Sequence, residues 1–314
     1  MLIVNPNFTI DRTIPLDVMV PGSVHRTGPA TASLGGKGVN VARIARAFGR
    51  PGVLVGFMPS TSAPELAMLA AAEGAELAGV PVTGVVRAAS IFLERSGRVT
   101  VFNEPGPTVE EGDWSRLLAE VKRRADSQQT VVCSGSLPPG SPLDGYARVV
   151  AAARAAGLRS VVDSTGEVLA SALTAHPDVV SPNLAEAETL VFGPAIEGVE
   201  PEGDLVVPRA IEAARGLVAR GARHAIVSAG SHGAAFSDGS ENAFLPAPEV
   251  SLVSPIGAGD SLVGGLVLAL EEGLPFGDAV RFALAVASAS CEQPVAGAVD
   301  PSRARALAAA VRIP

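Results

Sequence analysis

An aspartate at the entrance of a predicted helix is the first candidate for chemistry. The segment "PIGAGDSLVGGLVLAL" (255–270) places Asp260 directly after a turn of two glycines and an alanine, and an apolar helical pattern follows. Backbone N–H groups at a helix N-terminus attract anions, so we expect Gly257, Ala258 and Gly259 to form an anion hole for a transferring phosphoryl group. Asp260 would then act as the general base that takes a hydroxyl proton. The alternative is that Asp260 only caps the helix.

A second glycine-rich turn opens another predicted helix, in "GGKGVNVARIARAFG" (35–49). Its Lys37 is one of only two lysines in the chain and lies among three glycines, which cost stability unless the backbone must bend or be approached there. Asn40 is expected in the first helical turn, on the same rim. These groups suit a polyhydroxylated, phosphorylated ligand, whereas a tight turn with a helix cap is the alternative. The spacing differs from the G-x-x-x-x-G-K-[ST] loop of P-loop proteins.

Two further motifs follow predicted strands. In "SPNLAEAE" (181–188), Asn183 ends a strand and Glu186 comes three residues later, which suits water-mediated Mg²⁺ binding beside nucleotide phosphates. The alternative is a strand-to-helix turn with an acid in the first helical turn. In "SAGSHGA" (228–234), small residues leave room for a nucleotide, and an ordinary turn is the alternative.

The elements that position these motifs alternate between apolar strands and helices. Such alternation is typical of βαβ units, so we expect an α/β fold of three layers, α/β/α, with a mainly parallel sheet covered on both faces. In such sheets ligands bind at the carboxyl ends of the strands, where this sequence has small and polar residues. The predicted strands are 2–5, 52–57, 130–135, 160–165, 178–183 and 224–230, and the predicted helices include 40–48, 145–157 and 208–221.

Two segments break this alternation. Residues 12–32 and 84–103 hold extended runs with no helix between them, and Ser-Gly at 96–97 suits a hairpin turn. We expect them to form a small antiparallel β-sheet lid on a single domain that spans 1–314. One apolar face of such a sheet must cover a ligand or pair with a second subunit, which predicts a homodimer through the lid.

Composition restricts the classes of partner. The formal net charge is −8, the opposite of what a nucleic-acid-binding protein normally carries. The two cysteines, Cys133 and Cys291, show no metal-type spacing and suit free thiols in a reducing cytoplasm. The N-terminal residues lack the basic region of a signal peptide, and no apolar stretch approaches the ~20 residues of a membrane span. We therefore expect a cytoplasmic protein.

The motifs together resemble those of the ribokinase-like sugar kinases, the phosphofructokinase-B family. The resemblance covers nearly the whole chain and includes both of the family's paired signatures, here "GGKGVNVARIARAFG" and "GAGDSLVGG". The segments "NPNFTIDRT", "EPGP" and "SGSLPPG" look like the branch that contains 1-phosphofructokinase, tagatose-6-phosphate kinase and the minor 6-phosphofructokinase. This branch implies ATP- and Mg²⁺-dependent phosphorylation of a phosphorylated ketohexose, with fructose 1-phosphate as the first choice and fructose 1,6-bisphosphate as its product.

The resemblance also implies roles for individual residues. Asp260 would be the catalytic base beside the amides of Gly257, Ala258 and Gly259. The contacts implied for the acceptor are Asp11, Gly36 and Asn40 to sugar hydroxyls, Lys37, Arg87 and Ser136 to the sugar's existing phosphate, and Arg26 reaching in from the lid. The contacts implied for the nucleotide are Asn183 and Glu186 to the phosphates and Mg²⁺ of ATP, and Ser228, Gly230 and Gly233 beside the nucleotide.

Three departures from the family pattern leave the acceptor open. Ser23 stands where the minor 6-phosphofructokinases carry a lysine, Pro255 where many relatives have a threonine, and Arg87 lies in "VRAAS" rather than an Arg-x-Asn pattern. Tagatose 6-phosphate, fructose 6-phosphate, an unphosphorylated sugar or a nucleoside remain alternatives. A sugar sensor without activity is an alternative of another class, but the intact Asp260 and its turn speak against it. No G-x-G-x-x-G follows the first strand, which disfavours a nicotinamide-linked oxidoreductase.

Overall fold

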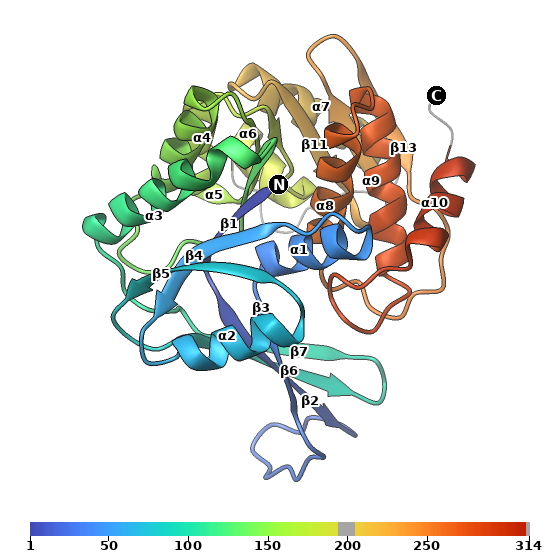
Figure 1. Ribbon diagram of the computed structural model, residues 1–314. Coiled ribbons are helices and arrows are strands. Elements are labelled where there is room, and N and C mark those ends of the chain that lie inside the picture. The colour runs from blue at the N-terminus through green and yellow to red at the C-terminus, as the bar shows by residue number, and fades with distance from the viewer. Residues whose placement is uncertain (194–204, 312–314) are drawn as a thin grey trace.

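The computed structural model describes residues 1–193 and 205–311, and it has three layers with helices on both faces of a central sheet (Figure 1). The sheet has the strand order β13-β12-β11-β10-β9-β8-β1-β4-β5. Neighbours from β11 through β5 pair in parallel, whereas β12 and β13 are antiparallel. The strands are β1 (Leu2–Asn7), β4 (Val53–Pro59), β5 (Glu76–Val82), β8 (Thr130–Ser134), β9 (Arg159–Asp163), β10 (Val179–Val180), β11 (His224–Ser228), β12 (Gly233–Ser237) and β13 (Asn242–Pro246). The predicted α/β fold is confirmed.

Each face of this sheet packs against its own set of helices. In β1, Ile3 belongs to one apolar core, and its neighbours Leu2 and Val4 belong to the other. A strand buried on both faces reads as a continuous apolar run, which is why such segments were recognisable in the sequence. The helices of the first face are α1 (Lys37–Ala47), α2 (Ala63–Ala72), α8 (Ala258–Glu271), α9 (Phe276–Ser290) and α10 (Pro301–Ala310). Those of the second face are α3 (Glu111–Arg124), α4 (Gly145–Ala155), α5 (Gly166–Thr174), α6 (Leu184–Phe192) and α7 (Val206–Ala219).

A second sheet projects from one side of the layers (Figure 1). Its strand order is β3-β2-β6-β7, and its strands are β2 (Thr9–Leu16), β3 (Thr31–Gly35), β6 (Arg87–Glu94) and β7 (Val99–Asn103). It begins three residues before the segment 12–32 that we expected, and residues 17–30 contain neither helix nor strand. The hairpin predicted at 96–97 joins the antiparallel pair β6 and β7.

The expectation of a wholly antiparallel small sheet is wrong at its centre, where β2 and β6 are parallel. The reason lies in the main sheet. The chain leaves β1 into β2 after one residue and leaves β5 into β6 after four residues. Because β1 and β5 point the same way in the main sheet, their continuations leave the same edge in the same direction.

Among the described residues, no helix is long and apolar enough to span a bilayer.

Candidate active site

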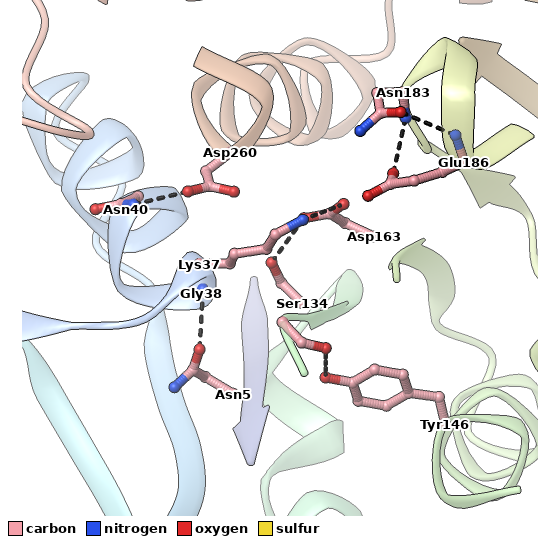
Figure 2. Close-up of polar contacts among 11 residues, drawn as sticks. Asn5, Lys37, Gly38, Asn40, Ser134, Tyr146, Asp163, Asn183, Glu186 and Asp260 are labelled. Atoms are coloured by element: carbon pink, nitrogen blue, oxygen red, sulfur yellow. Dashed lines mark hydrogen bonds and ion pairs between the residues drawn. The ribbon is translucent and has the colours of Figure 1, made fainter. Parts of the chain in front are cut away.

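Asp260 lies in the first turn of α8 and is 6% exposed. Gly257 takes the N-cap position of this helix with a φ of 78°, a left-handed conformation that favours glycine. The carboxylate of Asp260 accepts a hydrogen bond from Nδ2 of Asn40 at 2.7 Å (Figure 2). Asp260 is therefore not the helix cap, and that alternative is excluded.

The surroundings of Asp260 raise the pKa of its carboxyl to about 7. Burial is the largest cause, and the negative charge of Asp163 adds to it. Lys37, the hydrogen bond from Asn40, and Arg43 act in the opposite direction. A carboxyl that exchanges its proton near neutral pH is well matched to general base catalysis.

Lys37 extends from the start of α1 toward Asp163 at the carboxyl end of β9 (Figure 2). Its Nζ lies 3.3 Å from Oδ1 of Asp163, and Oγ of Ser134 donates to the other oxygen of that carboxylate at 3.2 Å. Burial disfavours the ammonium, but the charges of Asp163, Asp260 and Glu186 outweigh this and raise the pKa of Lys37. The lysine therefore stays charged among carboxylates at the centre of the site.

A cavity of about 390 Å³ lies between the main sheet and the inner face of the small sheet, and it is lined by Asn40, the hydrogen-bond partner of Asp260. It brings together six of the seven residues that the sequence analysis assigned to the acceptor: Asp11, Gly36, Lys37, Asn40, Arg87 and Ser136. Ala89, Ile91 and Val101 of the small sheet contribute apolar wall. The first glycine-rich turn thus lines this cavity through Gly36 and Lys37, and Ile256, the residue just before the second turn, reaches it as well.

Arg26 does not line this cavity. It lies in a separate hollow near the far end of the small sheet, with Asp17, Glu94 and Arg95. Within one chain, then, the structure separates Arg26 from the other six residues assigned to the acceptor.

Three side chains of the cavity carry buried polar atoms that have no hydrogen-bond partner among the described residues. These atoms are Nδ2 of Asn5, Oδ1 of Asn7 and Nε of Arg87. An unpartnered buried polar atom costs roughly 1–3 kcal/mol, so three of them in one cavity indicate a polar ligand. Two of the atoms are donors and one is an acceptor, and all three belong to residues that line this cavity.

Hydrogen bonds order the part of the cavity around Arg87. Nη2 of Arg87 donates to the backbone oxygen of Asn7 at 3.1 Å, and Nδ2 of Asn7 donates to Oγ of Ser136 at 3.3 Å. Because Ser136 accepts this bond, its own hydroxyl proton remains free to donate into the cavity. Asp11 faces the same space, and burial raises the pKa of its carboxyl against the opposing charges of Arg43 and Arg87.

A second cavity, of about 590 Å³, lies on the other side of the α8 turn. Ser228, Gly230 and Gly233 line it as the sequence analysis expected, and Ala258 and Gly259 form its boundary with the α8 turn. Its remaining wall is largely apolar: Ala247, Pro248, Val250, Leu252, Leu262, Leu284, Ala287 and Cys291. An apolar slot that ends at the N-terminus of a helix fits a planar base with phosphates attached.

Asn183 and Glu186 form a capping box at the start of α6 (Figure 2). Oδ1 of Asn183 accepts from the N–H of Glu186 at 2.9 Å, and Oε2 of Glu186 accepts from the N–H of Asn183 at 3.0 Å. The alternative of a strand-to-helix turn is thus correct for the local geometry. The second oxygen of Glu186 makes no bond in this box, so the box leaves it able to face a hydrated cation.

The residue set fits Mg²⁺ only as a partner of phosphates. Among the described residues, no three His, Cys, Asp or Glu side chains are placed to hold a metal together. Mg²⁺ commonly keeps several waters and binds one or two carboxylates plus substrate phosphates, which agrees with this sparse set.

Sequence reasoning missed Asp163, Asn5 and Asn7 as site residues. Asp163 ends an apolar strand in "SVVDST", a position that faces the ligand edge of a parallel sheet. Asparagine is scarce in this chain, and two of its six asparagines lie in "NPN" at the end of the first strand. Both signals were present in the sequence, but neither says which neighbours a side chain meets.

Comparison with known proteins agrees with this geometry. A family model described as pfkB family carbohydrate kinase matches residues 5–303. The 1-phosphofructokinase of Rhodobacter capsulatus is 31% identical, over 99% of this chain and 96% of that protein. The 1-phosphofructokinase of Haloferax volcanii is 34% identical, over 92% of this chain and 90% of that protein. Among solved structures, phosphofructokinase-2 from Escherichia coli in complex with potassium superposes with a TM-score of 0.89 at 28% identity, covering 99% of this chain and 98% of that one.

Proposed function

Because the chain belongs to the pfkB family of carbohydrate kinases, we propose that it transfers the γ-phosphoryl group of ATP to fructose 1-phosphate and forms fructose 1,6-bisphosphate. The observation that carries the choice of a phosphorylated acceptor is the set of unpartnered polar atoms of Asn5, Asn7 and Arg87 in the cavity of about 390 Å³. Two relatives named 1-phosphofructokinase, matched over almost their whole length, support the 1-phosphate.

The reaction uses the two ends of the acceptor cavity. At one end, Asp260 takes the proton of the acceptor hydroxyl as its oxygen bonds to the γ-phosphorus, and the bond from that phosphorus to ADP breaks. The N–H groups at the start of α8 stabilise the charge on the transferred group. Positioning and such charge stabilisation are the main contributions of a protein to phosphoryl transfer. At the other end, Arg87 and Ser136 hold the phosphate that the sugar already carries.

We assign Lys37 to the transferred phosphoryl group rather than to the sugar's existing phosphate. Its ammonium contacts Asp163 and is held by the charges of Asp260 and Glu186, so it lies on the Asp260 side of the cavity. There its charge can offset the negative charge of the incoming phosphates. Arg87, with its free Nε, remains the main cation for the sugar phosphate.

ATP would occupy the apolar cavity beside Gly230 and Gly233, with its phosphates directed to the α8 turn. Mg²⁺, when bound, neutralises phosphate charge, and Glu186 is the side chain best placed to meet its water shell. Asn183 holds Glu186 in position through the capping box.

The test is turnover on a panel of acceptors, each with ATP: fructose 1-phosphate, fructose 6-phosphate, tagatose 6-phosphate, fructose and adenosine. We expect the highest kcat/KM with fructose 1-phosphate. Fructose 6-phosphate carries its phosphate at the opposite end of the same sugar, so a preference for it would overturn the 1-phosphate while keeping the kinase. A preference for fructose or adenosine would overturn the phosphate site.

Two variants in the same panel separate the two cations. Lys37→Met should lower kcat by about 10- to 100-fold and leave KM for fructose 1-phosphate nearly unchanged. Arg87→Met should raise that KM, since a charge-assisted contact contributes about 1.5–3 kcal/mol, and should leave the weak turnover of plain fructose unchanged. The reverse pattern would return Lys37 to the sugar phosphate.

We further propose that the small sheet is a lid that pairs two copies of the chain. Leu93, Val101 and Phe102 are between 40% and 60% exposed on it, and alternation along β7 places the last two on opposite faces. Sedimentation of the native chain should show a dimer, and Phe102→Asp should weaken it. Met68→Asp, at an exposed apolar residue of α2, is the matched control. A native monomer at micromolar concentration would contradict this proposal.

A cytoplasmic location completes the proposed function. Cys133 and Cys291 are both free thiols, as expected in a reducing compartment. ATP and sugar phosphates are charged metabolites that fit the same compartment.

A further inference from the structure

Arg43 lies one helical turn after Asn40 in α1 and contacts it from the side away from Asp260. Nη1 of Arg43 donates to Oδ1 of Asn40 at 2.7 Å, and Nδ2 of Asn40 donates to Oδ2 of Asp260 at 2.7 Å. We infer that Arg43 is a positioning residue that acts on Asp260 through the side-chain amide of Asn40. This inference rests on the proposed role of Asp260 as the base.

The chemistry of the amide explains why Arg43 matters. An asparagine side chain has an accepting oxygen at one end and a donating NH₂ at the other, and a guanidinium can only donate. Arg43 therefore forces the oxygen of Asn40 toward itself and the NH₂ toward Asp260. Without Arg43 the amide could turn over and present its oxygen to the carboxylate, which would disfavour the ionised base.

Arg43 is itself held with all of its donors in use. Nε and Nη2 bind the two oxygens of Glu73 at 2.8 Å each, and Nη2 also donates to the backbone oxygen of Leu34 at 2.6 Å. Nη1 reaches the backbone oxygen of Ala296 at 3.2 Å in addition to Asn40. These five contacts match the five N–H groups of a guanidinium, so a lysine could not reproduce them.

The partners of Arg43 also link the base to the small sheet. Leu34 belongs to β3, and its N–H donates to Glu73 at 3.0 Å while its oxygen accepts from Arg43. The pair of Arg43 and Glu73 thus fixes the end of β3 that leads into the glycine turn before α1. A displacement of β3 would therefore reach Asp260 through two side chains, Arg43 and Asn40.

The test is the pH dependence of kcat/KM for fructose 1-phosphate in Arg43→Gln and Arg43→Lys. The charged groups that face Asp260 are Asp163 from β9 and Lys37 and Arg43 from α1. In Arg43→Gln, loss of the charge and of the enforced Asn40 donation raises the pKa of Asp260, so the acidic limb of the profile should move to higher pH. Arg43→Lys keeps the charge and loses only the enforced donation, so the shift should have the same direction and be smaller. At neutral pH we expect kcat to fall by about 10- to 100-fold, with partial recovery at high pH and an unchanged KM for ATP.

The matched control is Arg46→Gln. Arg46 lies on the same helix and contacts the backbone oxygen of Glu73, but none of its hydrogen bonds reaches Asn40. Its profile should stay that of the native chain. If a folded Arg43→Gln, judged by its unfolding temperature, kept the native pH profile and kcat, Arg43 would be only structural and the inference would be overturned.

Two further variants keep the result decisive. Glu73→Gln loosens the guanidinium without removing it and should move the acidic limb in the same direction by less, which serves if both Arg43 variants fail to fold. Asp260→Asn separates the role of the base from the role of Arg43. Full activity in Asp260→Asn would overturn the proposed base itself, whereas an inactive Asp260→Asn with a native profile in the Arg43 and Glu73 variants would overturn only the role of Arg43.

Discussion

The two glycine-rich turns of this protein open helices in the same way but leave their N–H groups in different states. At α1, the N–H of Gly38 donates to Oδ1 of Asn5 at 3.0 Å, so a protein side chain occupies the helix N-terminus. At α8, a Cβ placed on Gly259 would meet no atom within 4 Å, and no side chain of the described residues accepts from its N–H. The first turn is thus closed by the protein at Gly38, whereas the second is open to an anion at Gly259, although the N–H of Ala258 in that turn donates to the backbone oxygen of Pro255 at 3.3 Å.

The difference shows how two similar motifs acquire different tasks. In the closed turn the glycines allow close packing, because the side chain of Asn5 lies against Gly36 and Gly38. This turn carries a cation, Lys37, whose charge is already paired with Asp163. In the open turn Gly259 leaves space for a ligand to approach the backbone, and the next residue is Asp260. The α1 turn thus carries the cation, Lys37, and the α8 turn carries both the base, Asp260, and the N–H groups of the proposed anion hole.

The largest expected effect tests the charge on the open turn. Asp260→Asn should lower kcat by about 10²- to 10⁴-fold, the usual range for loss of a general base, and change the affinity for ATP little. The helix remains capped by Gly257, so the variant should fold. Steady-state kinetics with fructose 1-phosphate decide it, and near-normal turnover would show that Asp260 is not the base.

A second, smaller effect separates access from packing by placing one methyl group on each turn. Gly259→Ala should lower kcat/KM by about 10- to 100-fold, because the methyl group enters the anion hole, and should leave the unfolding temperature unchanged. Gly38→Ala should instead lower the unfolding temperature and leave kcat/KM nearly unchanged. Its Cβ would lie 2.7 Å from Cβ of Asn5 and 2.9 Å from Cγ2 of Ile3, and such overpacking costs about 1–3 kcal/mol. Equal losses of activity and stability in both variants would remove the distinction between the turns.

Sequence periodicity predicted the frame of the fold well, because strands buried on both faces and helices with one apolar face leave strong patterns. It predicted strand lengths and directions less well where they depend on which strands pair. The strand expected over 178–183 has only two residues, Val179–Val180, and the parallel pairing of β2 with β6 depends on how β1 and β5 leave the main sheet. Neither outcome is written in the local composition of those segments.

The same limit applies to the site. The two glycine-rich turns at helix starts, with Lys37 and Asp260, could be predicted, because glycines beside one of only two lysines, or directly before an aspartate and an apolar helix, are conspicuous. The side chains that contact Lys37 and Asp260 could not be predicted. The contact of Lys37 with Asp163 joins residues 126 positions apart, and Arg43 looked like any other arginine of an amphipathic helix. Arg26 was expected to reach the acceptor but lines a separate hollow within this chain, because a lid segment without regular structure sets no direction for its side chain.

The smallest expected effect compares the two turns by stability rather than rate. The folded pKa of Asp260, about 7, lies above the ordinary value of 3.8, so the folded chain binds a proton more tightly than the unfolded chain does. Burial of this carboxyl therefore costs nothing well below pH 4 and costs most above pH 7, after the proton has left. Asn resembles the protonated form and keeps the hydrogen bond from Asn40. Asp260→Asn should thus raise the unfolding temperature by about 2–5 °C at pH 8 and hardly at all at pH 4.

Lys37→Met should instead lower the unfolding temperature at pH 8, because the raised pKa of Lys37 means that its charge stabilises the fold below pH 10.5. Thermal unfolding of both variants at the two pH values measures this, with Asp126→Asn at an exposed site as the control. A gain for Asp260→Asn of the same size at pH 4 and pH 8 would show that the charge of the base carries no cost in the folded chain.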